Sequence, residues 1–108
     1  MNTEQASRLN EIINNDCEYQ GRYFYRGKAC IIGAMIQSIG LKPKRPPAWN
    51  YDTVYNLPTR ITNSLCESFG LTLEDLSEFI NINDSPSTIE VRRMELCREV
   101  ERILAGGE

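Results

Sequence analysis

The spacing of apolar and polar residues along the chain predicts a mainly helical (α+β) fold with about five helices. Apolar residues recur every three or four positions in most of these segments, as the buried face of an amphipathic helix requires. The helices are predicted over residues 3–14, 29–38 and 57–69, from Thr72 to the polar stretch NINDSP, and from Ser87 to about Leu104.

The segment from Ala29 to Ser38 has almost no polar face. Between Cys30 and Ile36 every residue is apolar or small, and a helix that is apolar all round is buried all round. Gly40 follows, at a position that suits the left-handed conformation in which helices often end. We therefore predict a buried central helix here, with the other helices packed around it.

Polar residues at the helix starts predict where three of the helices begin. The expected caps are Thr3, Thr72 with Asp75, and Ser87 with Glu90, the last two as capping boxes. Such a cap contributes about 1 kcal/mol to stability.

Two further expectations concern the last two helices. The apolar face of the fourth is expected to comprise Leu73, Leu76, Phe79 and Ile80. On the fifth, Arg98 is expected to pair with Glu95 and Glu101 at three-residue spacing.

Between the first two helices, aromatic residues alternate with Gly21 and Gly27, which predicts a short β-hairpin. Residues 41–57 hold three closely spaced prolines, which exclude regular helix and favour extended backbone. Residues 105–108 are predicted to form a frayed tail. No internal repeat or boundary divides the chain, so residues 1–108 are expected to be one compact domain.

Composition narrows the class of protein. A chain of 108 residues with 41% hydrophobic and 25% charged residues is typical of a globular protein that builds its own core. Its net charge of −3 argues against a general polyanion binder. No secretory signal and no apolar run long enough for a membrane span are evident, so a cytoplasmic location with reduced thiols is expected.

The cysteines and the missing histidine limit the chemistry. Cys17, Cys30, Cys66 and Cys97 match no zinc-binding spacing, and the chain has no histidine. Mixed cysteine–histidine zinc sites and histidine-dependent triads are therefore excluded, and neither a metal nor another cofactor is expected.

Cys30 has two possible interpretations. At a helix N-terminus near Arg26 and Lys28 its thiol pKa would be lowered, and Asp84 or another carboxylate would serve as base if the protein were a cysteine-dependent enzyme. That alternative needs an exposed Cys30. Free cysteine more often packs as a small apolar residue, and this reading is favoured.

Basic and aromatic residues on both sides of the central helix are the leading candidates for binding. One group is Arg22, Tyr23, Tyr25, Arg26 and Lys28; the other is Lys42, Lys44, Arg45, Trp49 and Tyr51. Such residues suit a nucleotide-like or other anionic ligand by stacking and charge-assisted bonds. They equally suit a protein interface. The third interpretation is that these residues form an ordinary surface whose charges are solvated.

Asn83 and Asp84 form a further polar candidate before the last helix. An EF-hand beginning at Asn81 is rejected, because its sixth and twelfth positions would be Pro86 and Arg92. The pair is expected to organise the turn between two helices, with a polar site as the alternative.

Two segments, CIIGAM and INDSPSTIEV, resemble a family of small uncharacterised bacterial and phage proteins. The matching positions are Cys30, Gly33, Ala34, Asn83, Asp84 and Val91. The resemblance implies no established activity. It implies that Cys30 and the pair Asn83–Asp84 approach one another, and that the chain comes from a phage or mobile element.

Together these observations favour a non-catalytic binding protein. It would block a host protein, as in evasion of a host defence, or sequester a small anionic ligand, and exposed aromatic residues would favour a homodimer. A nucleic-acid-binding regulator is the third alternative. It is disfavoured because the last helix mixes Arg92, Arg93 and Arg98 with nearly as many glutamates.

Overall fold

The described part of the chain is mainly helical, which confirms the predicted class. The computed structural model describes residues 1–15, 24–25, 28–41 and 57–106. Its elements are α1 (Thr3–Asn15), β1 (Phe24–Tyr25), β2 (Lys28–Ala29), α2 (Ile31–Ser38), α3 (Thr59–Phe69), α4 (Leu73–Asn83) and α5 (Ile89–Gly106). None of the described helices is long and apolar enough to cross a membrane.

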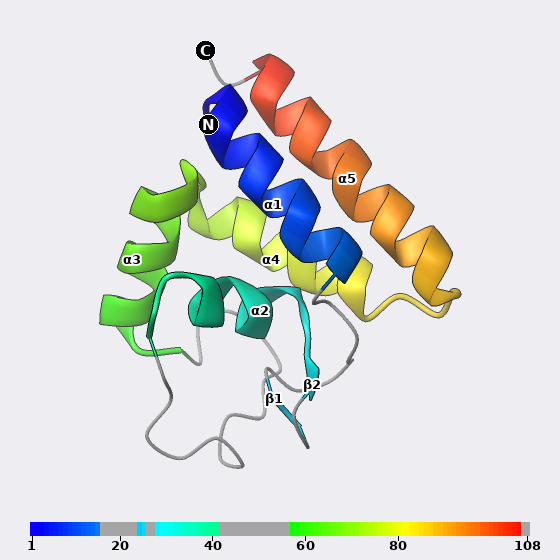
Figure 1. The fold of residues 1–108 in the computed structure, drawn as a ribbon, viewed down its shortest axis with the longest axis horizontal. Coiled ribbons are helices and arrows are strands. Elements are labelled where there is room, and N and C mark those ends of the chain that lie inside the picture. Colours follow the sequence, from blue (N-terminus) through cyan, green and yellow to red (C-terminus); the bar gives the residue numbers. More distant parts are fainter. Residues whose placement is uncertain (16–23, 26–27, 42–56, 107–108) are drawn as a thin grey trace.

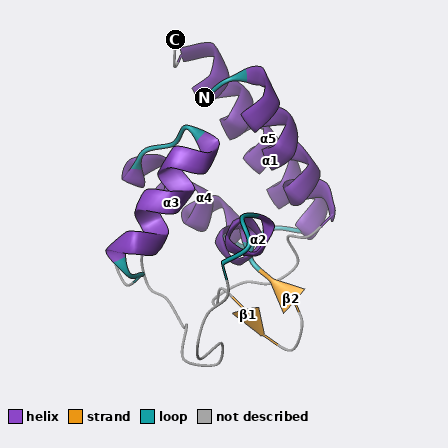
Figure 2. Ribbon diagram, turned by 60° about the vertical axis from the view of Figure 1, so that its left-hand side comes forward, coloured by secondary structure: helices purple, strands orange, loops and turns teal. Residues whose placement is uncertain are grey.

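Helices α1 and α5 lie side by side and antiparallel, with α4 packed against α5 (Figure 1). Helix α2 lies across one end of this arrangement and contacts α1, α3 and α4. The short strands lie beyond α2, on the side away from the C-terminal end of α5 (Figure 2). Helix α2 therefore separates the helical body from the strand pair.

The strands form one antiparallel ladder of two residue pairs, Phe24 with Ala29 and Tyr25 with Lys28. The rest of the segment for which a hairpin is predicted, residues 16–23 and 26–27, lies outside the described residues. The helical class is thus established. In the described residues, the β structure consists of these two residue pairs.

Helix α2 is the buried central helix that its sequence predicts. All residues from Ile31 to Ile36 are buried. The helix begins two residues later than expected, because Cys30 has extended backbone and serves as its N-cap. The helix ends at Ser38, and Gly40 two residues later has the predicted left-handed conformation, with φ of 80°. The Gly40 and Leu41 N–H groups donate to Gln37 O and Ile36 O, which is the Schellman arrangement.

The cap predicted for α4 is confirmed, and the one predicted for α1 is wrong. Thr72 and Asp75 exchange side-chain-to-backbone hydrogen bonds of 2.9 and 3.1 Å. At α1 the cap is Asn2, whose Oδ1 accepts from Gln5 N while Gln5 Oε1 accepts from Asn2 N, both at 2.8 Å. Thr3 would face Ala6 in the reciprocal position, and alanine has no acceptor to complete the box.

Helix α5 begins at a different cap from the one expected. Thr88 Oγ1, not Ser87, accepts the Val91 N–H at 3.3 Å. Ser87 is engaged elsewhere, since its hydroxyl lies 3.1 Å from Ser85 Oγ and its carbonyl accepts from the Arg92 guanidinium. At the other end α5 continues to Gly106, so residues 105–106 are helical and only 107–108 lie outside the described residues.

Two expectations for the last helices need correction. Leu73 is 39% exposed, whereas Leu76, Phe79 and Ile80 are buried; helical spacing places Leu73 on their face, but it is the first residue of α4 and so lies at the end of the helix. The ion pair that α5 makes within the described residues joins Arg102 to Glu99, not Arg98 to Glu95 or Glu101. The core of described residues draws on every helix: Leu9 and Ile13, Ile31 to Ile36, Leu65 and Phe69, Leu76 and Phe79, Leu96 and Val100.

Candidate functional site

The N-terminus of α2 is where the predicted site residues of the described chain meet. Cys30 is fully buried, and its Sγ accepts a hydrogen bond from Gly33 N at 3.4 Å. A helix leaves its first N–H groups without intrahelical partners, and an N-cap side chain normally satisfies one of them. The Cys30 thiol therefore has the place and the hydrogen bond of a capping residue within the core.

Asn83 supplies the second partner for this helix end. It is the last residue of α4 and is 2% exposed. Its Oδ1 accepts the Ile31 N–H at 3.2 Å across a separation of 52 residues. Its Nδ2 donates to Asp84 Oδ1 at 3.3 Å. The structure thus brings Asn83 to the residue that follows Cys30.

Asp84 lies beside this contact but faces solvent. It is the C-cap of α4, and its N–H donates to Ile80 O at 2.9 Å. Within the turn that follows, Ser85 Oγ donates to Ile82 O at 2.7 Å. The amide of Asn83 reaches outside that turn to α2, so its role extends beyond organising the turn, in agreement with the approach to Cys30 that the resemblance implied.

Asn83 and Thr62 are the buried polar residues among those described, and they differ in which helix their side chain bonds to. The Thr62 hydroxyl donates to Thr59 O within its own helix, at 3.0 Å. Asn83 connects two helices instead. The side chain of Asn83 made it a polar candidate in the sequence. Nothing in the sequence singles out its partner Ile31, because the contact uses a backbone N–H.

The thiols of Cys66 and Cys97 are free and half-buried. Burial, with a smaller effect of Asp75, raises the pKa of Cys66. Burial, with a smaller effect of Glu101, raises the pKa of Cys97. Cys17 lies outside the described residues, and no group of three or more cysteine or carboxylate side chains in the described segments is placed to hold a metal ion.

Most of the basic and aromatic candidates lie outside the described residues. These are Arg22, Tyr23, Arg26, Lys42, Lys44, Arg45, Trp49 and Tyr51. The backbone of Tyr25 and Lys28 is described, in β1 and β2 respectively. Both candidate segments join the described chain at α2, since β2 ends one residue before Cys30 and the described segment containing α2 ends at Leu41.

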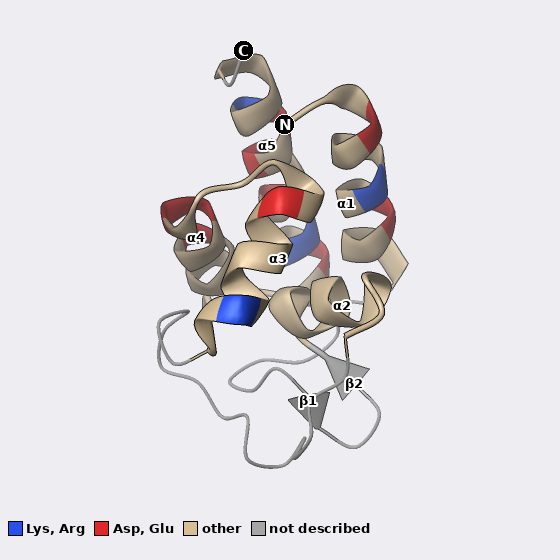
Figure 3. Cartoon of the chain, turned by 90° about the vertical axis from the view of Figure 1, so that its left-hand side faces the viewer, with Lys and Arg blue, Asp and Glu red and all other residues tan. Residues whose placement is uncertain are grey.

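Within the described helices, the positions of charged residues lie on α1, α3, α4 and α5 (Figure 3). Helix α2 carries none. Arg60 lies exposed in the first turn of α3.

Comparison with other proteins gives no match: no protein-family model, curated protein or solved structure is significantly similar to this chain. Function therefore has to be inferred from the chain's own residues.

Proposed function

We propose that this protein is a non-catalytic binding protein that holds an anionic ligand or partner at the α2 end of the fold. The observation that carries the proposal is the distribution of charge. Between Glu18 and Asp52 the sequence has six basic residues and no acidic one. Because the whole chain has a net charge of −3, the remainder has nine more acidic than basic residues. The chain is strongly polarised although its net charge is small.

Helix α2 lies at the middle of this acid-free stretch. Helix α2 has eight residues, and a helix of that length is about 12 Å long. Its N-terminus is capped by Cys30 and Asn83 and its C-terminus is closed at Gly40. The two basic segments therefore join the described chain at opposite ends of this helix.

The residue types in these segments favour a phosphate-bearing ligand or an acidic protein surface. Arginine and lysine form charge-assisted hydrogen bonds to phosphate and carboxylate groups, and Tyr23, Tyr25 and Trp49 offer surfaces on which a base or a partner side chain can stack. Six of the nine aromatic residues of the chain lie between Glu18 and Asp52. Charge and stacking groups thus coincide in one part of the sequence.

The burial of Cys30 favours binding over catalysis by this thiol. A nucleophilic cysteine needs access to substrate and an adjacent base, whereas Cys30 is 0% exposed and its sulfur accepts a backbone hydrogen bond. The further proposal that the partner is a host component blocked by a phage or mobile-element protein rests on the resemblance at Cys30, Gly33 and Ala34 together with the segment from Asn83 to Val91.

Native mass spectrometry tests the proposal. Protein purified from its host cells is compared with the same protein refolded after denaturation. We expect an added mass in the first sample only, either that of a phosphate-bearing small molecule or that of an acidic protein, and the spectrum also reports whether the chain is a dimer.

High salt should release the bound ligand or partner, because exposed charge interactions are screened. A bound nucleic acid would instead support the regulator alternative, with a steep inverse dependence of affinity on salt. Bare protein in both samples would contradict the proposal.

A further inference from the structure

The amide of Asn83 does more than fill a space in the core. One side of it satisfies the N–H of Ile31, the first residue of α2, and the other donates to Asp84 Oδ1. The second bond fixes which way the amide is turned, because only the nitrogen can donate. Asn83 Oδ1 is consequently directed at the start of α2.

Two groups from different parts of the chain share the N-terminus of α2. The Gly33 N–H is satisfied by Cys30, from within the same segment, and the Ile31 N–H by Asn83, from the end of α4. Without Asn83 the buried Ile31 N–H would lose this acceptor, and an unsatisfied buried donor is costly. The start of α2 is thereby tied to α4.

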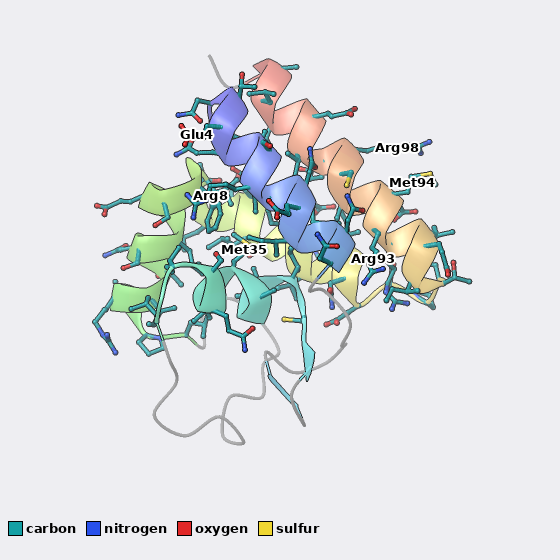
Figure 4. All side chains as sticks on the ribbon, viewed as in Figure 1. Glu4, Arg8, Met35, Arg93, Met94 and Arg98 are labelled. Atoms are coloured by element: carbon teal, nitrogen blue, oxygen red, sulfur yellow. The ribbon has the colours of Figure 1, made fainter. Side chains whose placement is uncertain are left out.

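The strand pair comes directly before the start of α2 in the chain. Strand β2 ends at Ala29, one residue before Cys30, and Lys28 in β2 pairs with Tyr25 in β1. Any movement of Ile31 relative to α4 moves the beginning of α2, and with it Lys28 and Tyr25. Figure 4 shows the strands leading out of α2 on the side away from α1 and α5.

We infer that Asn83 is the positioning residue of the strand pair, which holds β2, and with it Lys28 and its partner Tyr25, in a fixed orientation on the helical body. This inference rests on the proposed function and adds to it the residue that orients these two candidate residues. Asn83 itself is buried and is not assigned a contact with the ligand.

Nuclear magnetic resonance of three variants tests the inference without needing the ligand. Asn83→Ala removes the acceptor, Asn83→Asp retains a side-chain oxygen at the same place, and Asn81→Ala is the matched control. Asn81 is the same residue type on the same helix, but it is exposed.

We expect amide exchange at Ile31 to become about tenfold faster or more in Asn83→Ala. The amide signals of residues 24, 25, 28 and 29 should shift as well, while those of Leu96 and Val100 in α5 keep their positions. Asn83→Asp should restore protection of Ile31 and the signals of the strand pair, and Asn81→Ala should resemble the wild type.

The inference is overturned if Ile31 exchanges as slowly in Asn83→Ala as in the wild type, or if it exchanges faster while the strand-pair signals stay in place. If Asn83→Ala does not fold, Asn83→Asp decides. Protected Ile31 together with displaced strand-pair signals would then refute the positioning role.

Native mass spectrometry of the same variants from host cells separates this inference from the proposed function. We expect Asn83→Ala to lose the added mass while Asn81→Ala and Asn83→Asp keep it. Retention of the mass by Asn83→Ala, with displaced strand-pair signals, would refute the positioning role alone. A wild-type protein without added mass would refute the proposed function, and the magnetic resonance result would stand separately.

Discussion

Gln5 lies so close to Gly70 that a Cβ atom at residue 70 would come within 2.7 Å of Gln5 Oε1. The same side chain donates from Nε2 to Ser68 O at 3.3 Å, and Arg8 of the same helix stacks over the Phe69 ring at 4.8 Å from its centroid. The start of α1 is thus packed directly on the C-terminal turn of α3. Gly70 has a left-handed backbone there, with φ of 65°.

Replacing Gly70 by alanine is expected to lower the free energy of unfolding by about 2–4 kcal/mol, from left-handed strain and crowding against α1 together. Gly40→Ala is the matched control. Gly40 is also left-handed, but nothing lies within 4 Å of where its Cβ would be, so only the strain of about 1–2 kcal/mol applies. Urea denaturation measures both variants. Equal losses would show that α1 does not press on Gly70.

Two leucines one turn apart on α4 should differ sharply in their contribution to stability. Leu76 is fully buried, whereas Leu73 is 39% exposed. We expect Leu76→Ala to cost about 2–5 kcal/mol through lost burial and the resulting cavity, and Leu73→Ala to cost less than about 1 kcal/mol. Thermal or urea unfolding compares them directly, and a large loss for Leu73→Ala would indicate that this side chain is covered in solution.

Thiol labelling should distinguish Cys30 from Cys66 and Cys97. Only the thiolate reacts, and the raised pKa values of Cys66 and Cys97 mean that less thiolate is present at a given pH than for an ordinary cysteine. Their labelling should be slow near neutral pH and should keep rising beyond the pH at which free cysteine levels off. Cys30, which is 0% exposed, should react last in the folded protein.

Timed alkylation followed by peptide mass spectrometry measures these rates, with denatured protein as the reference in which burial no longer protects any thiol. Fast labelling of folded Cys30 would show an accessible thiol and restore the cysteine-enzyme alternative.

Charge reversal should separate the acid-free stretch from the helical body. Lys28→Glu and Arg98→Glu change the net charge by the same amount, but Lys28 lies between Glu18 and Asp52 and Arg98 lies exposed on α5. We expect Lys28→Glu to weaken retention of the anionic ligand by roughly tenfold or more and Arg98→Glu to leave it nearly unchanged. Native mass spectrometry across a salt series measures the effect. Equal weakening by both variants would mean that net charge alone governs binding.

Features set by neighbouring residues were predictable from the sequence. The continuous apolar run from Cys30 to Ile36 predicted the buried helix, Gly40 its left-handed end, and Thr72 with Asp75 the start of α4. Each of these depends on residues within one or two turns of each other, so the linear pattern contains the necessary information.

Features that depend on distant segments, or on which of several nearby polar groups bond to one another, were not predictable in the same way. Ser87 has the sequence of a cap, yet its hydroxyl and carbonyl are engaged by Ser85 and Arg92, and the neighbouring Thr88 caps α5. Asn83 was recognised as a polar candidate, but its partner is a backbone N–H 52 residues away. The resemblance implied that Cys30 and the pair Asn83–Asp84 approach one another, and the contact beside Cys30 agrees with this, but no side-chain pattern encodes a bond to a backbone N–H.

The closed ends of α2 have a consequence for engineering. Cys30 and Asn83 accept the N–H groups of Gly33 and Ile31 at its start, and the Gly40 and Leu41 N–H groups donate to its last turn. Because the acceptor for Ile31 comes from α4, a design that transplants α2 into another domain has to carry the end of α4 with it. Helix α2 is therefore a part of a two-helix unit rather than a module that can be moved by itself.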